Sequence, residues 1–128
     1  MSDWIPFGEG RYRVEQAFLI APNLHATVLE KAFIEVYLDR RQRLQLKGRG
    51  FVYNILVVQM LEDTDEIDLI LDLGGDYKYI LKNPKLDAGK VFSPRIKSTM
   101  QFSPGTPWEQ IPQKEFENLA SRLKLLSV

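Results

Sequence analysis

The fold is decided by the stretch from Phe51 to Leu61, which reads Phe-Val-Tyr-Asn-Ile-Leu-Val-Val-Gln-Met-Leu. It is rich in β-branched and aromatic residues, carries no charge, and stops at the acidic residue Glu62. An uncharged run of this kind is typical of a strand that is buried on both faces. A helix is the alternative, but the Val57-Val58 pair and the aromatic residues favour a strand. We therefore expect a central strand with hydrogen-bonded neighbours on both sides.

The composition indicates one globular domain over residues 1–128, of which 45% are hydrophobic. There is no cysteine, which excludes disulfides, thiol nucleophiles and cysteine zinc sites, and which suits a reducing compartment. The 17 basic and 17 acidic side chains cancel, so net charge gives no attraction to nucleic acid or to membranes. No apolar run reaches the ~20 residues of a membrane span, and the N-terminal residues lack a signal-peptide pattern. We expect a soluble, cytoplasmic protein.

Several further segments have the alternation or the apolar content of strands. They are Arg11–Ala21, Arg43–Lys47, Glu66–Leu73, Tyr77–Leu81 and a short strand around Ile96–Phe102. Gly48 and Gly50 predict a turn or bulge before the central strand. Gly74-Gly75 predicts a two-residue hairpin turn, because both glycines can take a positive φ.

Two segments have helical spacing. Phe116, Leu119 and Leu123 belong to an apolar stripe that predicts a helix from about Pro112 to Leu126. Thr27–Leu38 fits a helix by its apolar stripe and capping-box pattern, and a strand by its alternation, and we favour the helix. The expected fold is therefore α+β: a mostly antiparallel sheet of about five to six strands, a C-terminal amphipathic helix at about 112–126, a second helix at 27–38, and an irregular lead-in over residues 1–10.

Basic residues crowd one segment, and Phe51 and Tyr53 follow it. The candidate anion- or partner-binding surface consists of Arg40, Arg41, Arg43, Lys47 and Arg49. Cations beside aromatic rings suit a polyanion or an acidic partner. The alternative is a solvated face that is neutralised by the acidic segment after Glu62.

Candidate residues for catalysis or metal binding are few. His25 is the only histidine and lies in a predicted turn, where a solvated side chain is the usual outcome. Asp63, Asp65 and Asp68 offer oxygen ligands, but the glycine and glutamate positions of a calcium-binding loop are not met. We expect no catalytic residues, no metal and no cofactor.

The segment Glu66–Asp72 followed by Tyr77–Lys82 resembles the metal-binding hairpin of the PD-(D/E)XK nuclease family, which implies Mg²⁺-dependent phosphodiester cleavage. Asp68 would be the aspartate and Lys82 the lysine, but Ile80 stands where the family has a carboxylate. A two-residue turn would also place Lys82 on the opposite face from Asp68.

The segment from Lys47 to Val52, Lys-Gly-Arg-Gly-Phe-Val, resembles the octapeptide of the RNA-recognition motif, whose aromatic residues stack on bases. Arg49 and Asn54 replace two of its aromatic residues, and Phe18–Leu24 has two residues more than the partner hexapeptide. These departures keep the motif out of our prediction.

Our main expectation is a non-catalytic protein-binding, adaptor or self-associating module, whose partner is another protein or a second copy of the chain. Exposed sheet edges are the feature that would support such pairing. The alternatives are nucleic-acid or polyanion binding through the basic 40–49 segment, and a divergent metal-dependent nuclease.

Overall fold

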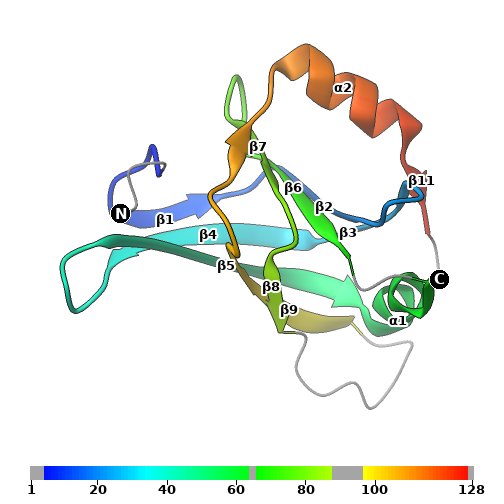
Figure 1. The fold of residues 1–128 in the computed structure, drawn as a ribbon, viewed down its shortest axis with the longest axis horizontal. Coiled ribbons are helices and arrows are strands. Elements are labelled where there is room, and N and C mark those ends of the chain that lie inside the picture. The colour runs from blue at the N-terminus through cyan, green and yellow to red at the C-terminus, as the bar shows by residue number, and fades with distance from the viewer. Residues whose placement is uncertain (1–4, 64–65, 88–96, 127–128) are drawn as a thin grey trace.

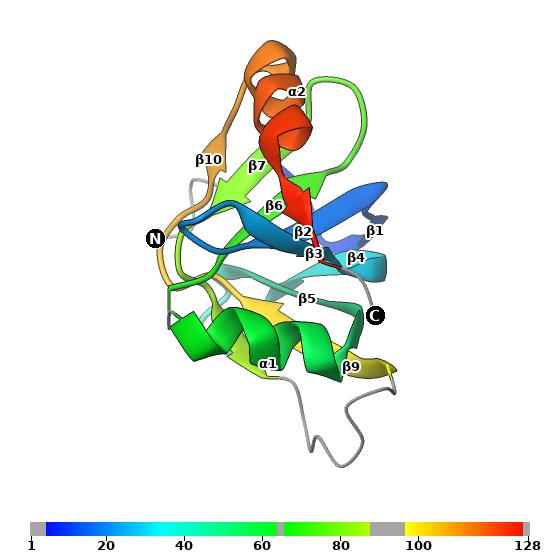
Figure 2. The same ribbon diagram turned by 90° about the vertical axis from the view of Figure 1, so that its right-hand side faces the viewer.

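The computed structural model describes residues 5–63, 66–87 and 97–126, and their strands form two sheets stacked face to face (Figures 1 and 2). Sheet A is antiparallel, with the strand order β1-β4-β5-β9-β8. Its strands are β1 (Gly10–Arg13), β4 (Glu30–Leu38), β5 (Leu44–Tyr53), β8 (Lys85–Asp87) and β9 (Lys97–Ser103).

Sheet B has the order β10-β7-β6-β2-β3-β11, and its pairs are antiparallel except for β3 with β11. Its strands are β2 (Gln16–Ile20), β3 (His25–Val28), β6 (Asp68–Asp72), β7 (Lys78–Leu81), β10 (Glu109–Gln110) and β11 (Lys124–Leu125). The predicted α+β class with mostly antiparallel pairing is confirmed, but the strands divide between two sheets.

The main core lies between the two sheets. Sheet A contributes every second residue of its strands, such as Ile34, Val36 and Phe102, while sheet B contributes residues such as Leu69 and Leu71. Because β6 also packs Ile70 against the helix on its other side, it is apolar without alternation over Leu-Ile-Leu. Within the described residues, sheet B is therefore covered on both faces, and sheet A on one.

The C-terminal helix is confirmed as α2 (Gln113–Arg122), although it is shorter than predicted. It lies on the side of sheet B that faces away from sheet A (Figure 2), with Phe116 buried against Ile70 and Ile111. Leu123 is extended, and the chain continues as β11, where the N–H of Lys124 donates to the carbonyl of Leu24. Pairing with β3 therefore ends the helix before the sequence pattern does.

The predicted central strand over Phe51–Leu61 is wrong. Strand β5 ends at Tyr53, and the chain turns directly into α1 (Asn54–Asp63). The helix buries Leu56, Val57 and Met60 at helical spacing and leaves Val58 46% exposed. Val57 and Met60 pack into the core between the sheets. A helix that is buried at one end of a sandwich can have the same uncharged sequence as a strand that is buried on both faces, so hydrophobicity alone does not distinguish the two.

The central strand is instead β5, and its glycines lie within it rather than at a turn. Leu46, Gly48, Gly50 and Val52 face inward. A Cβ at Gly48 would overlap the ring of Phe102, so the ring of β9 packs directly on the backbone of β5.

The predicted helix at 27–38 is also wrong, because this segment is the end of β3 followed by β4. Ala32, Ile34 and Val36 are buried, while Phe33 and its alternate neighbours point outward. Both periods fit the sequence, and pairing with β1 and β5 decides between them.

The predicted strand Arg11–Ala21 is two strands in different sheets. Between them, the N–H of Val14 donates to Ala32 of sheet A (3.0 Å), and the N–H of Glu15 donates to Asp72 of sheet B (2.8 Å). Consecutive residues thus join the two sheets.

The β6–β7 hairpin is confirmed, but its turn is longer than two residues. The N–H of Leu73 donates to Tyr77 (2.8 Å), and the N–H of Tyr77 donates to Gly74 (2.9 Å). Asp72 consequently pairs with Lys78. This one-residue difference changes which side chains share a face.

The described part of the lead-in packs its aromatic residue, Phe7, on the body of the protein. The ring of Phe7 lies 5.0 Å from that of Tyr12 and 6.1 Å from that of Trp108, which stacks on Tyr79 at 4.2 Å. These rings cover a part of the inter-sheet core.

Candidate functional site

The outer face of sheet A is not covered by either helix of the described chain. In Figure 2, α2 lies beyond sheet B, and α1 packs at the end of the sandwich. We call the outward side chains of sheet A the open face. They are Arg11, Arg13, Glu30, Phe33, Glu35, Tyr37, Gln45, Lys47, Arg49, Phe51, Tyr53, Lys85, Asp87, Lys97, Thr99, Gln101 and Ser103.

Four aromatic rings lie on the open face, on the neighbouring strands β4 and β5. They belong to Phe33, Tyr37, Phe51 and Tyr53, and Phe51 is 42% exposed. The other three rings are half-buried. Aromatic rings that gather on one sheet face, unlike apolar residues scattered singly, indicate a contact surface.

Cations lie over three of these rings. The guanidinium carbons of Arg11 and Arg49 lie 4.5 and 5.1 Å from the centroid of Phe33. The Nζ of Lys47 lies 4.9 Å from the ring of Tyr37, and the Nζ of Lys97 lies 4.8 Å from that of Tyr53. The open face therefore alternates positive charge with planar rings.

Basic side chains outnumber acidic ones on the open face. The acidic residues are Glu30, Glu35 and Asp87. Glu30 is paired with Lys97 at 2.5 Å, and this hydrogen bond raises the pKa of the Lys97 ammonium. Glu35 is 3.9 Å from Arg11. The remaining positive charge includes Lys47 and Arg49 on the central strand.

A groove of about 250 Å³ crosses the open face around Phe33. Its lining is Arg11, Phe33, Glu35, Lys47, Gly48, Arg49 and Gln101. Two adjacent rows of the sheet form it, because Arg11 and Lys47 pair with Glu35, while Arg49 pairs with both Phe33 and Gln101. We call this the Phe33 groove. Its volume is below the roughly 300–1,000 Å³ of pockets for whole small molecules, so it suits one planar group.

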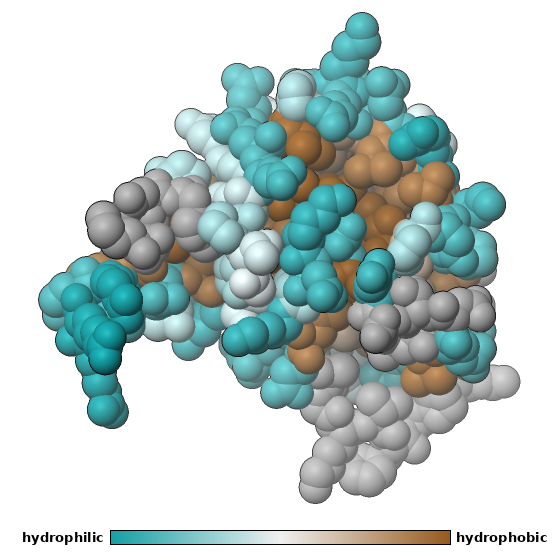
Figure 3. All heavy atoms as spheres, viewed as in Figure 1, coloured by the Kyte–Doolittle hydropathy of each residue, from teal (hydrophilic) through white to brown (hydrophobic). Residues whose placement is uncertain are grey.

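The five basic residues that the sequence singled out divide into two groups. Lys47 and Arg49 lie on the open face, whereas Arg40 and Arg41 are exposed in the turn between β4 and β5, with Arg43 beside them. This hairpin extends away from the sandwich in Figure 1, and its far end is hydrophilic in Figure 3.

The side chain of Asp39 accepts hydrogen bonds across the turn between β4 and β5 that carries Arg40, Arg41 and Arg43. Its Oδ1 accepts from the N–H groups of Arg43 (3.0 Å) and Arg41 (2.8 Å), and its Oδ2 accepts from Gln45 (3.1 Å). The hydrogen bond from the Arg43 backbone is the main reason that the pKa of Asp39 is lowered. These hydrogen bonds stabilise the backbone of the turn that carries the arginines.

Sequence reasoning missed Arg11, Phe33, Tyr37 and Lys97. Phe33 and Tyr37 were hidden because the helical interpretation of 27–38 concealed their outward alternation with Glu35. Lys97 and Arg11 reach the face only through pairing of distant strands.

The prediction that Asp68 and Lys82 lie on opposite faces of the hairpin is wrong. The two side chains are not on opposite faces: Lys82 Nζ lies 3.4 Å from Asp68 Oδ2, and the N–H of Asn83 donates to Asp68 Oδ1 at 2.9 Å. The longer turn explains the difference. Ile80, at the position of the family's carboxylate, pairs with Ile70 and packs, partly buried, against the core under α2.

Metal ligands do not cluster in the described ranges, where no three histidine, aspartate or glutamate side chains could hold an ion together. Asp65 and the side chain of Asp63 lie outside the described residues. His25 lies in β3, with its Nδ1 3.2 Å from Asn23 Nδ2.

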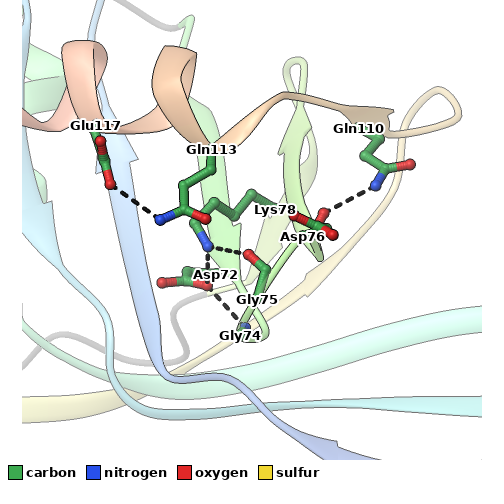
Figure 4. Close-up of polar contacts among 8 residues, drawn as sticks. All are labelled: Asp72, Gly74, Gly75, Asp76, Lys78, Gln110, Gln113 and Glu117. Atoms are coloured by element: carbon green, nitrogen blue, oxygen red, sulfur yellow. Dashed lines mark hydrogen bonds and ion pairs between the residues drawn. The ribbon is translucent and has the colours of Figure 1, made fainter.

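A buried ion pair between Asp72 of β6 and Lys78 of β7 lies at the β6–β7 turn (Figure 4). Lys78 Nζ lies 3.3 Å from Asp72 Oδ1, donates to the carbonyl of Gly75, and is 5.4 Å from the ring centroid of Phe116. The N–H of Gly74 donates to the same Asp72 oxygen at 2.8 Å. Lys78 is 6% exposed, so this pair is enclosed within the protein and supports the turn and the helix.

Comparisons with known proteins give no family: no protein-family model, curated protein or solved structure matches the chain. Among the described helices, none combines the length and the apolar character that crossing a membrane requires.

Proposed function

We propose that this protein is a non-catalytic nucleic-acid-binding module that holds a single strand on the open face of sheet A. The observation that carries the proposal is the set of four outward aromatic rings interleaved with Arg11, Lys47, Arg49 and Lys97. A single strand offers bases that stack on aromatic rings and phosphates that pair with cations.

A flat face favours a single strand over a duplex. In a duplex the base faces are stacked on each other, and proteins reach the base edges with a helix or ribbon in a groove. On a sheet, the rings of Phe33 and Phe51 can receive only bases that are already unstacked.

The cations over the rings do not prevent stacking. An exposed cation–π contact contributes about 0.5–1 kcal/mol, whereas stacking of a base on an aromatic side chain contributes about 1–3 kcal/mol. A base can therefore displace the guanidinium of Arg11 or Arg49 from Phe33, and the guanidinium remains beside it to meet a phosphate or a base edge.

The charge of the open face also favours nucleic acid over the protein partner that the sequence first suggested. The centre of a protein–protein interface is depleted of lysine, glutamate and aspartate. Here the centre of the face, on β4 and β5, carries Glu35 and Lys47 between the rings.

Binding of a fluorescently labelled single-stranded oligonucleotide, followed by anisotropy over a range of salt concentrations, tests the proposal. Neutralising Lys47 and Arg49 together with glutamine lowers affinity and reduces the slope of log K against log salt, by about 0.7 for each phosphate that the protein no longer neutralises. The matched control neutralises Lys114 and Arg122, exposed residues of α2 on the other side of the molecule.

The aromatic contribution is tested with Phe51→Ala, which removes an exposed ring from the open face. The control is Tyr77→Ala, which removes a 51% exposed ring from the β6–β7 turn. Equal weakening of binding in the face and control variants, or no binding at low salt, contradicts the proposal. A dimer that dissociates on Phe51→Ala without any nucleic-acid binding supports self-association instead.

A further inference from the structure

We infer that the Phe33 groove is a base-specific subsite that selects guanine. The inference depends on the proposed function and deepens it, since it concerns one position on the same face. The groove holds a planar ring, a carboxylate and two guanidiniums within two adjacent rows of sheet A. A general electrostatic surface for phosphates needs no carboxylate, so the presence of Glu35 calls for an explanation.

Phe33 is the stacking platform of this subsite. Its ring is half-buried from below and has Arg11 and Arg49 above it, at 4.5 and 5.1 Å from the centroid. Both arginines are exposed, and they can swing to the rim when a base takes their place on the ring. Each then presents N–H donors in the plane of the bound base.

Glu35 is placed to meet the edge of that base. It follows Phe33 by two residues on β4, so both side chains point to the same face about 7 Å apart. Lys47 and Arg11 pair with Glu35 in register on either side, so its carboxylate lies between two cations of the same row. The Arg11–Glu35 ion pair is long, at 3.9 Å, and a base edge can replace it.

An ionised carboxylate only accepts hydrogen bonds, so it requires donors. Guanine presents two adjacent donors, N1–H and N2–H₂, which match the two oxygens of Glu35. It also presents two adjacent acceptors, O6 and N7, which match an arginine fork. Thymine and uracil place a single N–H between two carbonyls that repel the carboxylate. Adenine and cytosine place a ring acceptor beside their amino group.

The experiment compares four thymidine oligomers that differ at one central nucleotide, which is guanine, adenine, cytosine or thymine. The guanine-containing oligomer has a single guanine, so it cannot form a quartet within one strand. The wild-type protein binds the guanine-containing oligomer about tenfold more tightly than the all-thymidine oligomer, the order of discrimination given by one bidentate contact. Affinity is again measured by fluorescence anisotropy.

Glu35→Gln removes the preference, so that the guanine-containing and the all-thymidine oligomers bind with equal affinity, because the variant lacks the second acceptor oxygen that guanine requires. The matched control is Glu109→Gln, an exposed carboxylate of sheet B, which keeps the preference. Circular dichroism and the melting temperature verify that both variants are folded.

The outcomes separate this inference from the proposed function. Equal affinity of the wild-type protein for all four oligomers overturns guanine selection while leaving nucleic-acid binding in place. A preference that persists in Glu35→Gln overturns the role of Glu35. Absence of binding to every oligomer overturns the proposed function, and the inference with it.

Discussion

Replacing Gly48 with alanine puts a methyl group where the ring of Phe102 already lies. The added Cβ would also be 2.7 Å from the backbone oxygen of Phe33, which cannot swing away as a side-chain tip can. Strand β5 pairs with β4 on one side and β9 on the other, so its backbone has no free direction in which to shift within the sheet. We therefore expect the substitution to destabilise the protein.

The magnitude follows from two opposing effects. Overpacking of a tight core costs about 1–3 kcal/mol, while the reduced flexibility of the unfolded chain returns about 0.4–1 kcal/mol. The net destabilisation is about 1–2 kcal/mol. With a urea m-value of about 2 kcal/mol/M, the midpoint of unfolding falls by roughly 0.5–1 M.

Gly8→Ala is the control, because a Cβ at Gly8 meets nothing within 4 Å. Its free energy of unfolding should change by less than about 0.5 kcal/mol. Adding Phe102→Leu to Gly48→Ala should recover part of the stability, which a double-mutant cycle measures. Equal midpoints for Gly48→Ala and Gly8→Ala would refute the pairing of β5 with β9 on which the open face depends.

Two further predictions concern charged groups. Lys78→Met leaves Asp72 buried without its partner and lowers the free energy of unfolding in urea by about 3–5 kcal/mol, whereas Lys82→Met at the exposed Asp68 pair changes it by less than about 1 kcal/mol. The pKa of Asp39 is lowered in the folded protein, so its contribution is present above the unfolded-state pKa and is lost as pH falls through the folded-state value. Wild-type protein should exceed Asp39→Asn in stability at pH 7, and the two should converge in acid; a gap that is independent of pH contradicts this.

Local signals predicted part of this fold. Glu66–Leu73 alternates except at Ile70 and is followed by two glycines, and the structure has β6 and a turn there. The stripe around Phe116 predicted α2. In these segments a single period fits, and local preference agrees with the tertiary environment.

The remainder depended on contacts between distant segments. Thr27–Leu38 fits two periods, and pairing with β1 and β5 selects the strand. The run after Tyr53 is apolar throughout, so its sequence fits both a helix and a strand. It is a helix in the structure, where it packs into the core at the end of the sandwich. The extra turn residue before Lys78 moved Lys82 to the side of Asp68.

The candidate site could be only partly anticipated for the same reason. Lys47 and Arg49 were identified because they are close in sequence to other basic residues. Phe33 and Arg11 meet them only after β1, β4 and β5 are aligned, and a cluster that exists only across strands leaves no local pattern.

The crossing at Val14 and Glu15 makes these adjacent amides a pair of reporters for motion within the molecule. One is protected from solvent by sheet A through Ala32, and the other by sheet B through Asp72. Different exchange rates at the two amides would indicate that the two sheets open separately, and equal rates would indicate that they open together. A ligand that occupies the exposed layer should slow exchange at Val14 before it slows exchange at Glu15.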